Sequence, residues 1–511
     1  MAVVGDQGDV TGFLRALPNA GEPVRTVATH ASVVFLTDYR AFKLKRAVSF
    51  PFLDFSTPER RLHFCETELA LNRRTAPKIY LAVRRITREP NGSLAFDGSG
   101  ELVDAVVEMR RFESGELFDE LAQHGWLTPA LMTDLARRIV AFHHSAEIDE
   151  RRGGVAGIAR VLEINEQALR AASVFSPLRT EALAAAFQKA LHRHGSLLEA
   201  RREAGKVRRC HGDLTLRNIC RFEGEPTIFD CLEFDEGLAA IDVLYDLAFL
   251  LMDLWHRNQP DLANLVFNRY LDGAGETDGL ELMPYFMAIR AAVRAHVTAV
   301  QASEAQEDGA EKLHKEALAY FELAERLMAP VAPMLVAVGG LSGSGKSTAA
   351  ASIASAVGAP PGARVLSSDR IRKALHAVAP ESRLPDTAYR PEISEQVYAR
   401  MRDEAIAALV AGCAVVADAV FDRPADREAI RRVADGAAVP FEGFWLSAPL
   451  DVLLGRLAGR KGDPSDATAA VLLAQAGRHC GELSWRPIDA ATELAHTRKT
   501  MLANLKGPGA P

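Results

Sequence analysis

The sequence predicts two domains that both combine helices and strands: an α+β domain with two lobes, then an α/β domain with three layers and a parallel sheet. The chain has 511 residues, which is more than one hydrophobic core usually organises. Strand patterns precede a long helical stretch in the first half, whereas strand and helix patterns alternate in the second half. Pro330 and Pro333 separate the two halves, so we place the domain boundary near residue 331, with domains at 1–330 and 331–511.

The first half begins with strands and continues as helices. Strands are expected at residues 24–36, 40–48, 79–87 and 103–112. A helix between the two strand pairs is expected to start near Thr57-Pro58, a cap residue followed by proline at an early helical position, and to end near Arg74. From about Ser114 to Gly205 the pattern is helical, and an amphipathic helix closes this half.

The second half repeats one unit of structure, a short apolar strand followed by a helical pattern. Strands are expected at residues 334–340, 363–369, 413–421 and 441–447. Because each strand is followed by a helical segment, neighbouring strands should run parallel with helices on both faces of the sheet.

Composition and charge exclude several classes of protein. The formal net charge is −7 and the pI is about 6.1, so no overall positive field is available to hold a nucleic acid. The first twenty residues contain acids and lack an apolar core, and the most apolar stretch, Leu244 to Trp255, contains two aspartates and is short for a membrane span. Six scattered cysteines form no C-x-x-C pair. We therefore expect a cytoplasmic protein with reduced thiols.

A first candidate site follows residue 210. His211, Asp213, Asn218 and Asp230 have the spacing of a kinase catalytic loop and the hairpin that follows it. Phosphoryl transfer needs an acceptor for the proton of the attacking hydroxyl, a role that suits Asp213. It also needs oxygen ligands for Mg²⁺, which Asn218 and Asp230 can supply.

Such a site also needs a strand lysine for the ATP phosphates and a helix glutamate that orients it. Lys43 is our choice, and Lys45 stays open because side chains two residues apart point to the same face of a strand. Glu68 or Glu66 on the following helix would be the partner.

The segments HGDLTLRN, IFDCLEF and IDVLYDLAFLL resemble the aminoglycoside phosphotransferase family, and the resemblance covers roughly residues 25 to 330. It implies a protein-kinase-like fold of two lobes, with Asp213 as catalytic base and Asn218 and Asp230 as magnesium ligands. It also implies that His211 and Asp246 brace the catalytic loop. Acids after residue 230, such as Glu233, suit a cationic acceptor and a solvated surface equally well.

The second candidate site is a complete Walker A sequence between an apolar strand and a helix-forming segment. Its glycines allow backbone N–H groups to surround phosphates, Lys346 would reach the β- and γ-phosphates, and Ser347 would bind Mg²⁺. The ATP-binding residues expected here are Gly340, Ser342, Gly343, Ser344, Gly345, Lys346, Ser347 and Thr348.

Two later strands end near acids, Asp369 and Asp418. The segments SSDRIRKAL and VVADAVF resemble P-loop kinases of the group that includes polynucleotide kinase, gluconate kinase and zeta toxins, over roughly residues 334 to 500. That resemblance implies that Asp369 faces the acceptor as a catalytic base. Asp418 stays open between a magnesium-side ligand and a structural carboxylate.

Arginines from a mobile lid are also expected to meet the phosphates in this second domain. Arg456 and Arg460 lie four residues apart, hence on one helix face, and precede the flexible sequence KGDPSDA. Arg423 and Arg427 have the same spacing and compete for the role.

The combination resembles bacterial proteins described as bifunctional aminoglycoside phosphotransferase/ATP-binding proteins. It implies the architecture and not the substrate. Our hypothesis is a fused enzyme in which both domains bind ATP and Mg²⁺ and the first domain phosphorylates a hydroxyl of a small molecule. Two alternatives stay open: one domain is catalytic and the other a nucleotide-gated regulatory module, or the P-loop domain is a polynucleotide or sugar kinase. The acidic charge balance disfavours nucleic acid as the substrate.

Overall fold

The structure is a computed structural model that describes residues 2–3, 5–29, 31–50, 53–459, 465–478 and 480–505. It divides into two compact units, residues 1–253 and 254–511. We refer to them as the first and second unit. Helix α8 (Val243–His256) contains the junction, which lies upstream of the domain boundary expected near residue 331.

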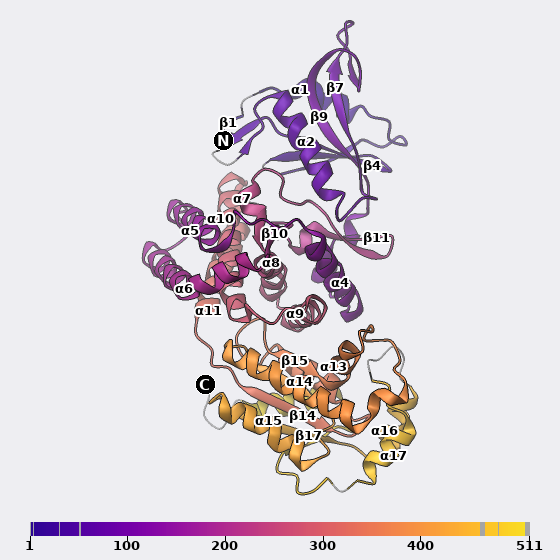
Figure 1. Cartoon of the computed structure of the whole chain (residues 1–511). Helices are drawn as coiled ribbons and strands as arrows, with labels where there is room; N and C mark the ends of the chain where they lie inside the picture. Colours follow the sequence, from indigo (N-terminus) through magenta and orange to yellow (C-terminus); the bar gives the residue numbers. More distant parts are fainter. Residues whose placement is uncertain are drawn as a thin grey trace. The chain divides into compact units, whose positions relative to one another are not determined.

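The first unit begins with a six-stranded antiparallel sheet in the order β2-β3-β4-β9-β7-β8 (Figure 1). Its strands are β2 (Arg25–Ala28), β3 (Ser32–Leu36), β4 (Arg40–Lys45), β7 (Tyr80–Arg88), β8 (Leu94–Phe96) and β9 (Glu101–Arg110). The segment expected as one strand at 24–36 is therefore a hairpin, because the chain turns after Ala28 and pairs β2 with β3. The expected strands at 40–48, 79–87 and 103–112 correspond to β4, β7 and β9.

Each face of this sheet is covered by a helix. On one face, α1 (Gly8–Arg15) packs its buried Val10 and Leu14 against Phe42 and Leu44 of β4. On the other face, α2 (Pro58–Asn72) lies against β9 and β7 (Figure 1). Side chains alternate between the two faces of a strand. Lys43 and Lys45, which alternate with Phe42 and Leu44, therefore point to the opposite face, toward α2.

The sequence patterns at the ends of these helices agree with their bounds. Thr57 caps α2 by accepting a hydrogen bond from Arg60 N at 3.3 Å, and Pro58 occupies the first helical position. Thr128 caps α4 in the same way. The rest of the first unit contains α3 (Phe118–Gln123), α4 (Pro129–Ser145), α5 (Gly154–Ala171), α6 (Pro177–Glu203) and α7 (Glu236–Ala239).

Small antiparallel ladders frame the segment that carries the first candidate site. β10 (Val207–Arg209) pairs with β13 (Ala240–Asp242), and β11 (Ile219–Phe222) pairs with β12 (Glu225–Ile228). β1 (Ala2–Val3), β5 (Val48–Phe50) and β6 (Leu53–Asp54) form a third ladder. The candidate residues between β10 and β11, and those just after β12, are thus supported by a ladder on each side.

The second unit starts with three helices that precede the parallel sheet: α9 (Pro260–Ala274), α10 (Met283–Glu304) and α11 (Glu307–Met328). Helices α10 and α11 pack along each other, and the His256 ring stacks on Tyr320 with 3.7 Å between centroids. None of the described helices combines the length and the hydropathy that crossing a membrane requires.

The parallel sheet has the order β15-β16-β14-β17-β18. Its strands are β14 (Leu335–Gly340), β15 (Arg364–Ser367), β16 (Val415–Asp418), β17 (Phe441–Ser447) and β18 (Arg486–Asp489). The first four were expected, and every pairing is parallel as predicted. The strand β18 was not expected, because RPID carries too little apolar sequence to be recognised.

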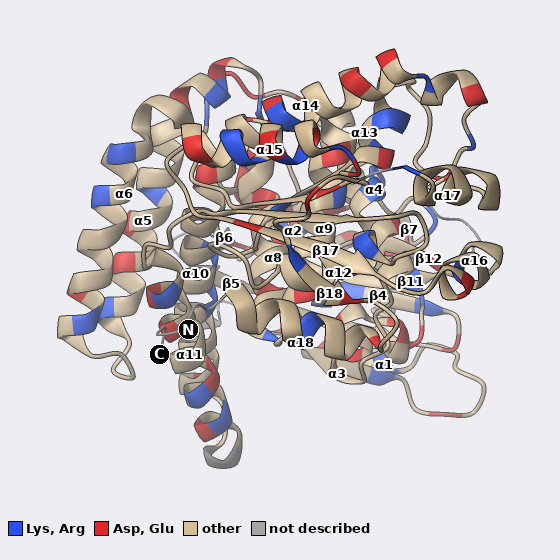
Figure 2. Cartoon of the chain, turned by 90° about the horizontal axis from the view of Figure 1, so that it is seen from below, with Lys and Arg blue, Asp and Glu red and all other residues tan. Residues whose placement is uncertain are grey.

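Helices cover both faces of this sheet, which gives the predicted three layers. α12 (Lys346–Ala354) and α18 (Leu494–Leu505) bury a core with Val336 and Val338 of β14, while α14 (Pro391–Val410) and α15 (Pro424–Gly436) lie on the other face. Figure 2 shows α14 and α15 on one side of the strands and α18 on the other. The remaining helices are α13 (Ser368–Leu375), α16 (Leu450–Ala458) and α17 (Ala469–Ala476).

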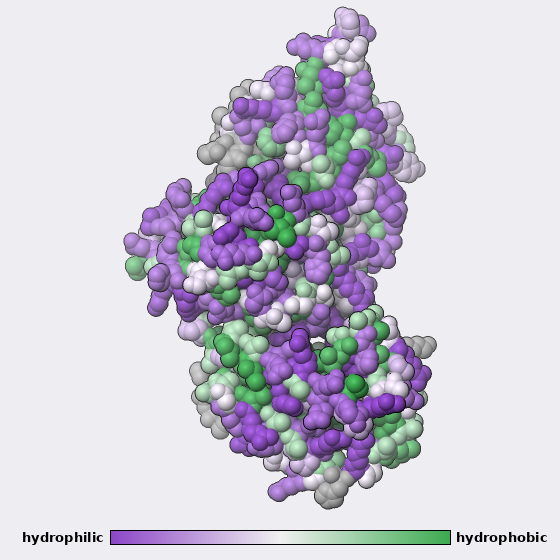
Figure 3. Space-filling view, in the orientation of Figure 1, coloured by the Kyte–Doolittle hydropathy of each residue, from purple (hydrophilic) through white to green (hydrophobic). Residues whose placement is uncertain are grey.

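In Figure 2, neither α14 nor α15 carries a continuous row of residues of one charge. Acidic and basic residues are interspersed along α14 and α15 in Figure 2, and hydrophilic residues cover most of the face of each unit in Figure 3. This distribution agrees with the net charge of −7 and offers no continuous basic track on those helices.

We predict that His296 on α10 makes the second unit less stable at low pH. Burial, together with the neighbouring Arg294, lowers the pKa of His296 from 6.5 to about 4. Between these values the unfolded chain binds more protons than the folded one, so stability falls as the pH is lowered. From pH 7.5 to pH 5 the parent should lose about 2 kcal/mol more unfolding free energy than His296→Gln, measured by urea denaturation. Equal losses in both proteins would contradict this assignment.

Candidate active sites

A buried cluster of charges joins the sheet of the first unit to α2 and to the segment after β12. Lys43 Nζ donates to Glu68 Oε1 at 2.9 Å and to Asp230 Oδ1, while Lys45 Nζ donates to Glu68 Oε2 at 2.7 Å and to Glu233 Oε1 at 2.5 Å. Glu68 therefore bridges both lysines, and Lys43 is the one that also reaches Asp230. The alternative partner, Glu66, is exposed on the outer face of α2.

Electrostatics within this cluster favour the charged forms of the lysines. Burial lowers the pKa of Lys43, but Asp230 and Glu68 outweigh that effect and hold the pKa well above its usual value. Burial raises the pKa of Glu68, but the two lysines bring it down to about 2. Burial raises the pKa of Glu233 despite Lys45. Two lysines thus meet three carboxylates, and Asp230 is the most exposed of the three, where a divalent cation would have access to it.

The catalytic-loop pattern brings Asp213 and Asn218 together as expected. Asn218 Nδ2 donates to the backbone oxygen and to Oδ2 of Asp213, both at 2.8 Å, so the amide oxygen is the end directed away from Asp213. Arg217, which sequence reasoning missed, donates to Asp213 Oδ2 at 2.9 Å. Asp213, together with Asp230 and Asp253, raises the pKa of Arg217 above its ordinary value, which indicates that these acids lie near one another.

Buried carboxylates from α8 hold the backbone of this loop. Asp246 accepts from His211 N at 3.0 Å and from Gly212 N at 2.9 Å, and His143 Nε2 lies 3.1 Å from it. Asp253 accepts from Leu216 N at 2.9 Å. Ligand atoms of His143, Cys210 and Asp246 are close enough to hold a metal ion, but each oxygen of Asp246 already accepts a backbone N–H, so we interpret the trio as a structural brace.

The segment after β12 is tied to both sides of the site. His211 Nε2 lies 2.8 Å from the backbone oxygen of Phe229, and Asn72 Oδ1 accepts from Cys231 N at 2.9 Å. Between them, Asp230 has φ +64°, a left-handed conformation that aspartate tolerates better than most residues but that still stores strain. Asn72 lies one helical turn after Glu68, and that i, i+4 spacing on the buried face of α2 was the available signal.

The acids that follow Asp230 are paired within the chain. Glu233 contacts Lys45, Asp235 pairs with Arg160 at 2.7 Å and caps α7, and Glu236 Oε2 lies 2.6 Å from Arg152. Their charges are therefore compensated, and these residues give no support to a cationic acceptor.

In the second unit, the Walker A sequence forms the turn between β14 and α12. Gly343 and Gly345 have φ of +86° and +79°, which a side chain would strain, and a Cβ on Gly343 would lie 2.7 Å from the backbone oxygen of Leu453. Gly345 is the cap residue of α12, so the N-terminal N–H groups of this helix, beginning at the buried Lys346, border the turn.

Polar groups at the ends of neighbouring strands lie near the Walker A turn. Asp418 ends β16 next to β14, and Ser367 ends the neighbouring β15. Burial raises the pKa of Asp418 and outweighs the opposing effect of Lys346, while the Asp369 carboxylate raises it further. Asp418 Oδ1 and Ser344 Oγ are buried without a hydrogen-bond partner among the described residues, which is what ligand atoms for a metal or phosphate would show.

The arginines that were candidates for contacting the phosphates differ in their surroundings. Arg456 on α16 lies beside the turn, with its guanidinium 4.0 Å from the position of a Cβ on Gly345. Arg427 is buried and donates to the backbone oxygens of Phe421 and Cys480, and Arg423 is exposed. Arg460 and most of the expected lid, residues 460–464, lie outside the described residues.

Two further side chains, not recognised in the sequence, hold segments around this turn. Gln475 of α17 is buried, and its Oε1 accepts from Ser342 N at 2.9 Å. Asp466, near the end of the expected lid, accepts from Lys373 Nζ at 2.5 Å and from Tyr389 at 2.6 Å. Neither could be found from sequence because the contacts span more than 70 residues.

Comparison with known proteins agrees with this division of chemistry. Residues 65–283 match the model of the phosphotransferase enzyme family, and residues 335–480 match an AAA domain. Proteins of Mycobacterium tuberculosis and Mycobacterium bovis are 30% identical over 493 residues, covering 94% of this chain and 95% of each relative; both are described as uncharacterized. The fold and sites thus define a kinase-like phosphotransferase domain followed by a P-loop kinase-like domain.

The chain belongs to the same family as these mycobacterial relatives. Among solved structures, a gluconokinase from Sinorhizobium meliloti is 25% identical, covers 34% of this chain and 91% of its own, and has a TM-score of 0.24. A choline/ethanolamine kinase family protein from Mesorhizobium loti is 15% identical, covers 62% of this chain and 93% of its own, and has a TM-score of 0.38.

We predict that Lys45→Met lowers the unfolding free energy of the first unit by about 3–5 kcal/mol, since it leaves Glu68 and Glu233 buried with one cation fewer. Lys43→Met should destabilise less, because Lys43 is partly exposed. Denaturant unfolding followed by circular dichroism measures both changes. Glu66→Gln, on the exposed side of α2, is the control and should stay within about 0.5 kcal/mol of the parent. A Lys45→Met protein as stable as the parent would show that the bridge contributes nothing.

Proposed function

We propose that this protein is an ATP- and Mg²⁺-dependent small-molecule kinase in which both units bind MgATP. The first unit would transfer the γ-phosphoryl group to a hydroxyl of its acceptor. The observation that carries this proposal is the cluster at Lys43, Glu68 and Asp230, together with the Asp213–Asn218 pair supported on the neighbouring ladders. These are the groups that phosphoryl transfer to a hydroxyl requires.

Within the first site we assign a role to each side chain. Asp213 accepts the proton of the attacking hydroxyl, and Arg217 and Asn218 keep its carboxylate oriented through their contacts to Oδ2. Asn218 and Asp230 would hold the metal, which neutralises charge on the phosphates when MgATP is bound. Lys43, kept charged and oriented by Glu68, would bind the phosphates.

In the second site, the Walker A turn and the unpaired oxygen atoms of Ser344 and Asp418 fit MgATP. Backbone N–H groups of the Walker A turn, with Lys346 and Arg456, would bind the phosphates, and Ser347 and Asp418 would hold the metal. Asp369, near enough to Asp418 to raise its pKa, would be the base that faces an acceptor. Residues Gly340, Ser342, Gly343, Ser344, Gly345 and Thr348 complete the proposed nucleotide site.

The proposal includes two domains with a boundary near residue 331, between the two family matches, and a cytoplasmic location. All six cysteines are free thiols in the structure, which supports a reducing compartment. A nucleotide-gated module in place of one kinase remains the alternative, and turnover by single-site variants separates the two.

We expect substrate-dependent ATP consumption to fall by about 10²- to 10⁴-fold in Asp213→Asn, because the proton acceptor is lost. The parent and variants would be screened by ADP release against aminoglycosides, sugars, amino alcohols and oligonucleotides. Lys346→Ala, which removes the P-loop lysine, reports on the second site, and Lys189→Ala on the exposed face of α6 is the matched control.

Each result indicates which unit performs phosphoryl transfer. Turnover lost in Asp213→Asn alone supports the first unit as the transferase and identifies its acceptor class. Turnover that survives this change and disappears with Lys346→Ala would contradict the assignment of the first site. An oligonucleotide as the acceptor would favour an end-processing kinase in the second unit.

A further inference from the structure

Helix α9 lies against the open edge of the parallel sheet in the second unit. β15 is the first strand in the sheet order, so only one of its edges pairs with another strand, β16. Arg364 N donates to Ala414 O at 2.8 Å on that side. The next residue faces the other way: Val365 N donates at 2.7 Å to Asn268 Oδ1 of α9. A helix side chain thus takes the place of a neighbouring strand.

Two buried asparagines complete this edge. Asn264 Nδ2 donates to the backbone oxygens of Pro361 and Ala363, both at 3.0 Å. Asn268 Nδ2 donates to Ala363 O at 3.1 Å. Asn264 and Asn268 are 3% and 2% exposed, so water cannot replace them, and unpaired backbone groups at this edge would be costly.

The last turn of α9 extends the contact to α13. Asp272 accepts from Arg364 at 2.6 Å and from Arg370 Nε at 2.8 Å. Burial would raise the pKa of Asp272, but Arg364, Arg370 and Arg269 outweigh it and lower the pKa. Arg370 follows Asp369 directly in the chain, and α13 begins immediately after β15, so no flexible loop separates the contact from the candidate base.

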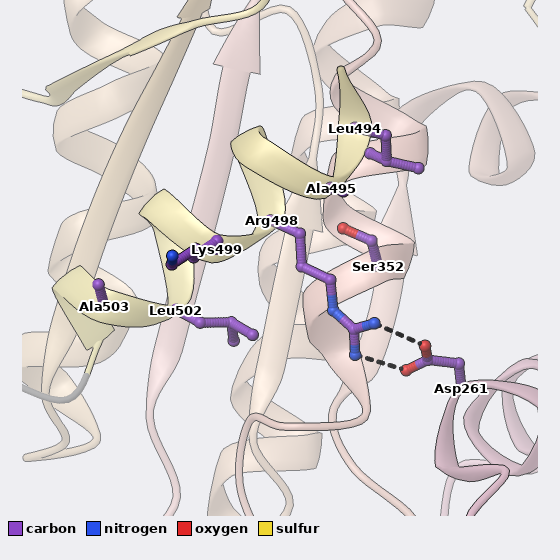
Figure 4. Close-up of a pocket in the computed structure, with 8 residues that line it drawn as sticks. All are labelled: Asp261, Ser352, Leu494, Ala495, Arg498, Lys499, Leu502 and Ala503. Atoms are coloured by element: carbon purple, nitrogen blue, oxygen red, sulfur yellow. Dashed lines mark hydrogen bonds and ion pairs between the residues drawn. The ribbon is translucent and has the colours of Figure 1, made fainter. Parts of the chain in front are cut away.

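The first turn of α9 makes a contact of the same kind elsewhere in the second unit. Asp261 pairs with Arg498 of α18 at 3.0 Å and accepts from Ser355. Figure 4 shows this ion pair at the side of an open pocket of about 720 Å³, whose lining includes Ser352 and Leu494. None of the candidate site residues lines this pocket. A variant of Asp261 therefore serves as the control for a variant of Asp272, because both change an ion pair of α9 but only Asp272 contacts β15 and α13.

We infer that Asn268 and Asp272 are positioning residues for the P-loop site: they hold β15 and α13 so that Asp369 keeps its place two residues after Ser367, which pairs with Asp418 across β15 and β16. This inference rests on the proposed function of the second unit. Both residues lie within 65–283, the stretch that matches the phosphotransferase enzyme family, and yet they complete an element of the P-loop fold. The second candidate site would therefore depend on residues assigned by sequence to the first domain.

Amide hydrogen exchange of the full-length protein, measured without nucleotide, tests whether Asn268 and Asp272 hold β15 and α13 in place. Asn268→Ala and Asp272→Asn should each raise exchange in residues 364–375 by about tenfold or more, while residues 346–354 of α12 stay within about twofold of the parent. Asp261→Asn, which removes a more exposed ion pair from the same helix, should leave exchange in residues 364–375 unchanged. Arg370→Gln breaks one of the two Asp272 contacts from the α13 side, so the double variant with Asp272→Asn should exchange no faster than Asp272→Asn alone.

Steady-state kinetics tests the catalytic consequence. In a full-length Asp213→Asn background, MgATP hydrolysis transfers the γ-phosphoryl group to water; ADP leaves, and Asp369 accepts the proton of the water. Asn268→Ala and Asp272→Asn should lower kcat by about tenfold with KM for MgATP within about twofold, since the nucleotide cradle is untouched. Asp272→Glu should recover part of kcat.

Two results would overturn the inference. One is exchange and kcat at parent values in both Asn268→Ala and Asp272→Asn. The other is a uniform loss of protection throughout the second unit, which would make α9 a stabilising helix without a positioning role. A separate result would show that the proposed function of the second unit is wrong: Lys346→Ala would leave MgATP hydrolysis in the Asp213→Asn background unchanged. Hydrogen exchange would still decide whether α9 holds β15 and α13.

Discussion

Both candidate sites depend on one constraint: the buried backbone N–H groups of their loops must find hydrogen-bond acceptors outside regular secondary structure. Buried carboxylates and amides from neighbouring helices supply them. Asp246 and Asp253 of α8 hold the catalytic loop, and Asn72 of α2 holds the segment that carries Asp230. Asn268 and Gln475 do the same for β15 and for the Walker A turn. Each unpaired buried group would cost about 1–3 kcal/mol, so these helices restrict the loops to one conformation.

Charge compensation adds a second level of order in the first unit. Glu68 binds Lys43 and Lys45 together, which links β4, α2 and the segment after β12 through a single carboxylate. Desolvation makes such a cluster costly unless every charge is paired, and Asp230, the most exposed of its carboxylates, is the one proposed to hold a metal ion. The second site shows the complementary situation, with a buried lysine beside aspartates and with oxygen atoms that lack a partner among the described residues.

Local patterns predicted most of the fold. Alternation and strand-to-helix order identified the strands of the antiparallel sheet, four of the five strands of the parallel sheet and the three-layer architecture, because these patterns depend on residues close in sequence. The split of the first strand into β2 and β3 and the edge strand β18 were missed, since a short turn and a polar edge strand leave weak patterns. The helices of residues 254–328 were expected in the first domain, yet they form one compact unit with the P-loop fold.

The sequence by itself determined the class of each domain and the residue types at each site, because the catalytic-loop and Walker A motifs place chemically specific side chains at short, fixed spacings. Only the tertiary structure showed that Glu68 rather than Glu66 faces the lysines, that Lys43 is the one reaching Asp230, and that α9 completes the edge at β15. These outcomes depend on which faces pack together and which buried groups need partners. Such contacts join residues 23 to 187 positions apart, a range over which periodicity carries no information.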